Sequence, residues 1–160
     1  HADYPKGAVI AYIDECTVSV KQHNHASDLS KIIRVTKTKV NNVKYAFNDS
    51  KIVIKIPDTH ASQYESVEAH YPSVIASNLV YNALVQAFYK LRHDSDESKD
   101  WVFYLRQYVK ECHENDIIDL EDEDYNLELE DIFTIVDHLL DNPQVSALEE
   151  IAGHNNIDDE

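Results

Sequence analysis

The hydrophobic period of this chain changes at Pro57, and that change sets the fold class. Within residues 51–56, isoleucine occupies every second position, which is the period of a half-buried strand. Beyond Pro57, apolar residues recur at spacings of three and four, which is the period of an amphipathic helix. A group of strands followed by a group of helices predicts an α+β fold.

The N-terminal part, residues 1–57, is predicted to form an antiparallel β-meander of about four to five short strands. The candidate strands are residues 8–13, 17–21, 32–38, 43–47 and 51–56. Asn41-Asn42 is expected to form a tight hairpin turn, because Asn tolerates a positive φ, and residues 48–50 are expected to form a second turn, before the last strand. The polar residues 23–30 are expected to form a loop.

Residues 58–154 are predicted to form about four to five helices that pack on the meander. The candidate helices are residues 58–70, 72–92 and 101–112, a segment beginning near Glu128, and a segment from Pro143 to Gly153. Residues 72–92 are apolar on most sides, which predicts a buried central helix. We expect one domain over residues 1–160, with a frayed tail at 155–160.

Charge is distributed very unevenly along the chain. Residues 1–56 hold nine Lys/Arg against five Asp/Glu, a net charge of +4, whereas residues 57–160 hold five against 25, a net charge of −20. Residues 111–160 hold 18 acids and no Lys or Arg. This asymmetry predicts a charged partner, and it argues against direct nucleic-acid binding by the acidic half, because such binding needs cations facing phosphates.

The rarest residue types exclude some functions. With only two glycines, the chain has no glycine-rich loop to wrap a phosphate, so we expect no nucleotide cofactor, and no other cofactor is predicted. The two cysteines, Cys16 and Cys112, are far apart and form no C-x-x-C pair, which is typical of a reducing, cytoplasmic compartment. The chain has no methionine, so we expect a piece of a longer polypeptide.

Two short histidine elements are candidate catalytic residues. His25-Ala26-Ser27 and His60-Ala61-Ser62 resemble the paired His-x-Ser/Thr elements of two-histidine phosphoesterases. That resemblance implies that the imidazoles of His25 and His60 act as base and acid while the hydroxyls of Ser27 and Ser62 hold a phosphate. The alternative interpretation is that the hydroxyls cap local turns and the histidines are exposed.

A metal site could draw on His23, His25 and His60. The chain contains no H-E-x-x-H motif and no Cys–His set at zinc spacing, which favours solvated loop histidines instead. Residues 119–130 have acids at several EF-hand positions, but Asp124 stands where the calcium loop needs glycine.

The charged segments are candidate partner surfaces. The basic candidates are Lys31, Arg34, Lys37 and Lys39, and the acidic candidates are Asp119, Glu121, Asp122, Glu123 and Asp124. We therefore predict a protein-interaction or assembly domain of a larger cytoplasmic microbial or viral protein, which binds a protein partner or itself and enters no membrane. Two alternatives stay open: an acidic DNA mimic of the anti-restriction type, and a histidine-dependent phosphodiesterase or metal hydrolase.

Overall fold

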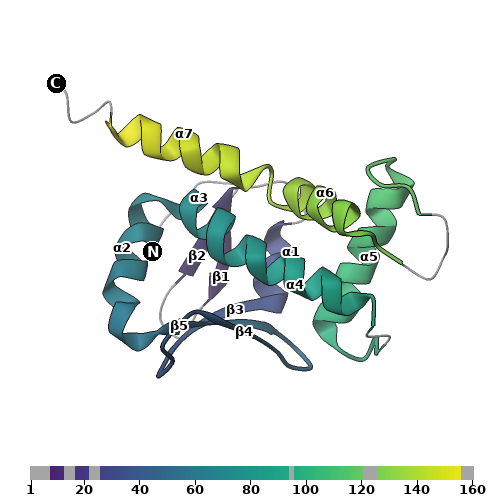
Figure 1. The fold of residues 1–160 in the computed structure, drawn as a ribbon, viewed down its shortest axis with the longest axis horizontal. Coiled ribbons are helices and arrows are strands. Elements are labelled where there is room, and N and C mark those ends of the chain that lie inside the picture. Colours follow the sequence, from purple (N-terminus) through teal and green to yellow (C-terminus); the bar gives the residue numbers. More distant parts are fainter. Residues whose placement is uncertain (1–7, 13–16, 22–25, 94–95, 121–125, 156–160) are drawn as a thin grey trace.

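The computed structural model describes residues 8–12, 17–21, 26–93, 96–120 and 126–155, and it contains two small sheets (Figure 1). The first sheet is the antiparallel pair of β1 (Ala8–Tyr12) and β2 (Thr17–Lys21). The second sheet contains β3 (Ile33–Thr38), β4 (Lys44–Phe47) and β5 (Ile52–Pro57), in the spatial order β3-β5-β4. The molecule is therefore an α+β structure.

The predicted antiparallel meander of four to five strands is wrong. In the second sheet β5 lies in the centre, parallel to β3 and antiparallel to β4. The reason is the apolarity of β5, in which Ile52, Ile54 and Ile56 are all buried, so that strand gains most from neighbours on both sides. Residues 39–43 consequently carry the chain past β5 rather than folding back beside β3, and the expected hairpin at Asn41-Asn42 does not form.

The turn predicted at residues 48–50 does join two antiparallel strands, β4 and β5. The Asn48 side-chain oxygen accepts hydrogen bonds from the backbone N–H groups of Ser50, at 3.0 Å, and Lys51, at 2.6 Å. The Asn48 N–H also donates to the Lys51 carbonyl at 3.0 Å. An asparagine side chain that accepts hydrogen bonds from the next backbone N–H groups closes a turn. Asn48 closes the β4–β5 turn in this way, whereas Asn41-Asn42 forms no such turn.

The predicted loop at residues 23–30 is wrong for residues 26–30, which belong to the helix α1 (Ala26–Ile32), while residues 23–25 lie outside the described residues. Its residues Leu29 and Ile32 are three positions apart and almost fully buried. Burial of these two apolar side chains outweighs the weak helix preference of a polar segment, as tertiary packing commonly does.

Every described secondary-structure element from Asp58 onward is helical (Figure 1). Its elements are the 3₁₀ turn η1 (Asp58–His60), α2 (Ala61–His70), α3 (Pro72–Ile75), η2 (Ala76–Val80), α4 (Tyr81–Leu91), α5 (Asp100–Glu114), α6 (Leu129–Leu139) and α7 (Pro143–Asn155). The predicted central helix at residues 72–92 is confirmed, with the addition that η2 is a π-helical stretch between α3 and α4. The predicted end at Gly153 is wrong, because α7 continues to Asn155.

One hydrophobic cluster joins the central sheet to the helices. It includes Val35 and Ile54 from the sheet, Phe88 from α4, Trp101 from α5 and Ile132 from α6, all at most 1% exposed. The strands and the helices therefore share a core, which fixes the surfaces between them. In the described part of the chain, no helix has both the length and the apolarity needed to cross a bilayer.

Candidate ligand groove

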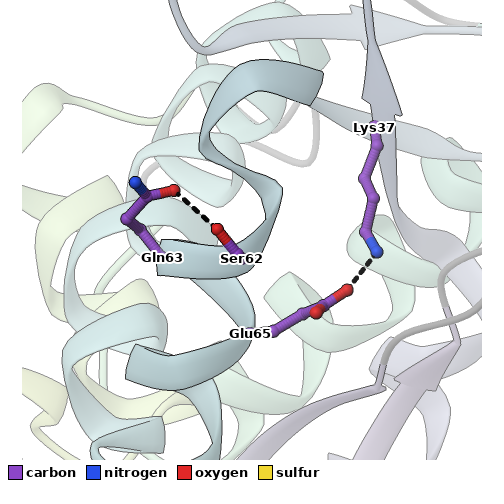
Figure 2. A network of polar contacts seen from close by, with 4 residues as sticks. All are labelled: Lys37, Ser62, Gln63 and Glu65. Atoms are coloured by element: carbon purple, nitrogen blue, oxygen red, sulfur yellow. Dashed lines mark hydrogen bonds and ion pairs between the residues drawn. The ribbon is translucent and has the colours of Figure 1, made fainter.

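The predicted histidine pair is only partly within the described residues. His60 is exposed in η1, with its Nδ1 3.0 Å from the Thr59 hydroxyl. The Ser62 hydroxyl is also exposed and donates to the Gln63 side-chain oxygen at 3.1 Å (Figure 2). His25 lies outside the described residues, and Ser27 belongs to α1, so the catalytic pairing stays a prediction.

The predicted metal ligands are also only partly within the described residues. His23 and His25 lie outside the described residues, while His60 is described and exposed. Among the residues that the structure describes, no three His, Cys, Asp or Glu side chains come together in a way that could hold a metal ion.

The predicted basic partner surface is spread over several faces. Lys37 lies on β3 in the same alternation as the buried Val35, and its ammonium forms an ion pair with Glu65 of α2 (Figure 2). Arg34 lies on the opposite face of β3, and Lys31 lies on α1. Lys39 is exposed just beyond the end of β3. Lys37 therefore serves an internal contact between sheet and helix.

Of the predicted acidic surface, the described residue is Asp119, which is exposed after α5. The other predicted members, Glu121, Asp122, Glu123 and Asp124, lie outside the described residues.

A groove that the sequence did not indicate lies where β4, α4, α5 and α6 meet. Its volume is about 740 Å³, which is in the usual range for sites that bind small ligands or peptide side chains. The described residues that line it are Phe47, Asn48, Val85, Gln86, Tyr89, Lys90, His93, Lys99, Trp101 and Leu129.

The wall formed by the β4–β5 turn is held against α5 by two hydrogen bonds. The indole N–H of Trp101 donates to the Asn48 carbonyl at 2.8 Å, and the Asp100 N–H donates to the Asp49 carbonyl at 2.9 Å. Trp101 is 1% exposed and also packs against Phe47, with ring centroids 5.4 Å apart. These two hydrogen bonds and the ring contact fix the position of the turn against α5 on this side of the groove.

Positive charge is concentrated in the groove. The ammonium of Lys90 lies 5.0 Å from the centroid of the Phe47 ring, and Lys99 contributes a second cation. Lys90 has no ion-pair partner among the described residues. His93 lies edge-on to the half-exposed ring of Tyr89, with centroids 6.1 Å apart. None of the described lining residues carries a carboxylate, although the chain contains 30 acids.

Burial raises the pKa of several groups outside the groove, among them Glu68 and Cys112. Burial raises the pKa of the Glu68 carboxyl to about 7, assisted by the negative charge of Glu65 and opposed by Lys37. The buried Glu68 Oε1 finds no hydrogen-bond partner among the described residues. Burial also raises the pKa of the Cys112 thiol to about 11, so this cysteine is a packing residue rather than a nucleophile.

Comparisons with protein-family models, with curated proteins and with solved structures found no match for this chain. The groove is therefore interpreted from its own residues alone.

Two sequence signals could have pointed to the groove. All five Lys/Arg of residues 57–160 fall between Lys90 and Lys110, and the only tryptophan of the chain, Trp101, stands within that interval. What the sequence could not supply was the approach of the β4–β5 turn, which brings Phe47 to Lys90 across more than forty residues.

Proposed function

We propose that this chain is a protein-interaction module that binds an acidic peptide segment of a partner in the groove between β4, α4, α5 and α6. The observation that carries the proposal is the charge of the groove. Two lysines and a histidine line it, while no described lining residue is acidic, in a chain with a net charge of −16. Complementary charge of this kind selects partners and speeds their association.

The apolar part of the groove defines the rest of the ligand. Phe47, Val85 and Leu129 supply apolar surface, and Tyr89 supplies an aromatic ring that is 52% exposed. Exposed aromatic residues beside cations are the side chains that most often anchor protein partners. The expected ligand is therefore a peptide in which one large apolar side chain is flanked by Asp or Glu.

The position of Lys90 supports this arrangement. Its ammonium lies over the Phe47 ring, and a cation held over an aromatic face keeps its charge available to an incoming carboxylate. A peptide carboxylate that reaches Lys90 would thus place the neighbouring apolar side chain against Phe47 and Val85.

The proposal predicts that charge reversal at Lys90 weakens peptide binding. We expect Lys90→Glu to weaken binding of a synthetic Asp/Glu-rich peptide with one central leucine by roughly tenfold or more, because attraction becomes repulsion. Binding is measured from the fluorescence of Trp101, the only tryptophan, using a peptide without aromatic residues.

The matched control is Lys110→Glu. Lys110 is an exposed cation on α5 that pairs with Glu114 at 3.9 Å and does not line the groove, so both variants change the net charge equally. Equal weakening by the two variants, or unchanged binding by Lys90→Glu, would contradict the proposal. A peptide with Gln at every acidic position should bind much more weakly to the unaltered chain.

The described part of the chain adds no observation that favours the DNA-mimic or hydrolase alternatives, so the protein-interaction proposal stands alone here.

A further inference from the structure

The outward face of α7 is apolar. Val145, Leu148 and Ile151 follow one another at spacings of three residues and are 56%, 70% and 42% exposed. An isolated exposed apolar side chain is ordinary, but three successive ones on one helix face mark a contact surface. In Figure 1 this helix lies along the edge of the molecule, beyond α3.

The opposite side of α7 is already packed. Ala147 is buried, and Glu150 accepts a hydrogen bond from the Ser73 N–H at 2.9 Å and one from the Ser73 hydroxyl at 3.4 Å. These contacts fix α7 on the start of α3. Since α7 has a docked side and a second apolar side, rotation of the helix cannot bury both.

The described elements that α7 contacts, α3 and η2, carry no Lys or Arg. Residues 57–89 and 111–160 contain no Lys or Arg, so α2, α3, η2, α6 and α7 are all without one. Glu149 is exposed on α7 itself, next to Leu148. A second helix that covered this face would therefore meet the exposed carboxylate of Glu149 and no Lys or Arg from α3, η2 or α7.

From this combination we infer that the outward face of α7 binds a Lys/Arg-rich amphipathic helix of a protein partner. Apolar residues of that helix pack on Val145, Leu148 and Ile151, as an amphipathic helix packs on an apolar face at spacings of three and four. Its basic residues pair with Glu149, and such charge pairing fixes orientation and disfavours acidic partners. This surface is separate from the groove and takes a ligand of opposite charge.

The test uses a fluorescein-labelled model peptide in which Leu and Lys alternate at helical spacing. We expect the double variant Val145→Gln, Leu148→Gln to bind it roughly tenfold more weakly than the unaltered chain at physiological salt, since both anchors are lost. Both replaced side chains are exposed, so the circular dichroism spectrum and melting temperature should be unchanged.

Phe103→Gln is the matched control. Phe103 is 52% exposed on α5, a helix that carries both cations and carboxylates, so its loss removes exposed apolar surface from a different helix. We expect this variant to bind the peptide as the unaltered chain does. Equal weakening by Phe103→Gln, or no weakening by the double variant, would overturn the inference.

A second copy of this chain is the alternative occupant. Sedimentation that shows a dimer of the unaltered chain, a monomer of the double variant and no difference in peptide binding would overturn the inference in favour of self-association. A monomer in both cases, with the expected loss of peptide binding, supports it.

Discussion

Burial removes hydration from the Glu68 carboxyl, and its Oε1 gains no hydrogen-bond partner in the described part of the chain. Its pKa is raised to about 7 by burial and by Glu65. The folded chain therefore binds the Glu68 proton more tightly than the unfolded chain, whose glutamate titrates at its ordinary value of about 4.3. This group lowers the stability of the fold as pH rises through the interval between those two values.

The variant Glu68→Gln tests this effect, because the glutamine side chain cannot ionise. We expect it to raise the free energy of unfolding at pH 8 by about 1 kcal/mol or less, after allowance for solvent screening of a half-exposed group. At pH 4 the two chains should be nearly equal. Urea unfolding at both pH values measures this, and the exposed Glu149→Gln serves as control. An equal effect at pH 4 and pH 8 would mean that ionisation of Glu68 is not the cause.

At the scale of elements, one carboxylate holds α7 on the rest of the molecule. Glu150 accepts from the Ser73 N–H at the beginning of α3, where Pro72 is the first helical residue and no local side chain caps the helix. A carboxylate at a helix N-terminus satisfies a free N–H group and opposes the positive end of the helix dipole.

Replacement of Glu150 should therefore be costly, while replacement of its neighbour should not. We expect Glu150→Ala to lower the free energy of unfolding by about 1 to 2 kcal/mol, and Glu149→Ala to change it by less than about 0.5 kcal/mol. Chemical denaturation of both variants gives these values. If the two substitutions had the same effect, the contact between α7 and α3 would not depend on this cap.

The sequence predicted elements with a strong local pattern and missed those decided by distant contacts. The apolar stripe of residues 101–112 and the Pro at position 143 located α5 and the start of α7, because helix period and Pro preference are local properties. The order β3-β5-β4 depends on which strand gains most from central burial, and α1 depends on packing of Leu29 and Ile32. Neither the strand order nor the helix α1 can be predicted from the local sequence pattern.

The same limit applies to the candidate site. Charge asymmetry and the lack of glycine loops were visible in the sequence, and the charged partner that they predict stays a prediction. The basic partner surface was predicted from cations that are close together in the sequence. In the fold, Lys37 instead forms an ion pair with Glu65. The groove could not be predicted, because Phe47 and Lys90 meet only after the strands and helices have packed.

At the scale of the whole molecule, charge is separated over the surface. The acidic half of the chain keeps its five cations between residues 90 and 110, and two of them line the groove, while α3, η2 and α7 have none. One molecule thus offers a cationic groove and a cation-free apolar face. Charged surfaces of opposite sign on one domain favour two different ligands and weaken as salt screens them.

The most direct test of this account is a nuclear magnetic resonance titration of the isotope-labelled chain with the Asp/Glu-rich peptide. We expect the largest chemical-shift changes at the Trp101 indole and at the backbone amides of the lining residues Phe47, Tyr89, Lys90 and Lys99. Shift changes centred instead on Lys31, Arg34 and Lys39 would place the acidic ligand on the N-terminal basic residues and would contradict the account.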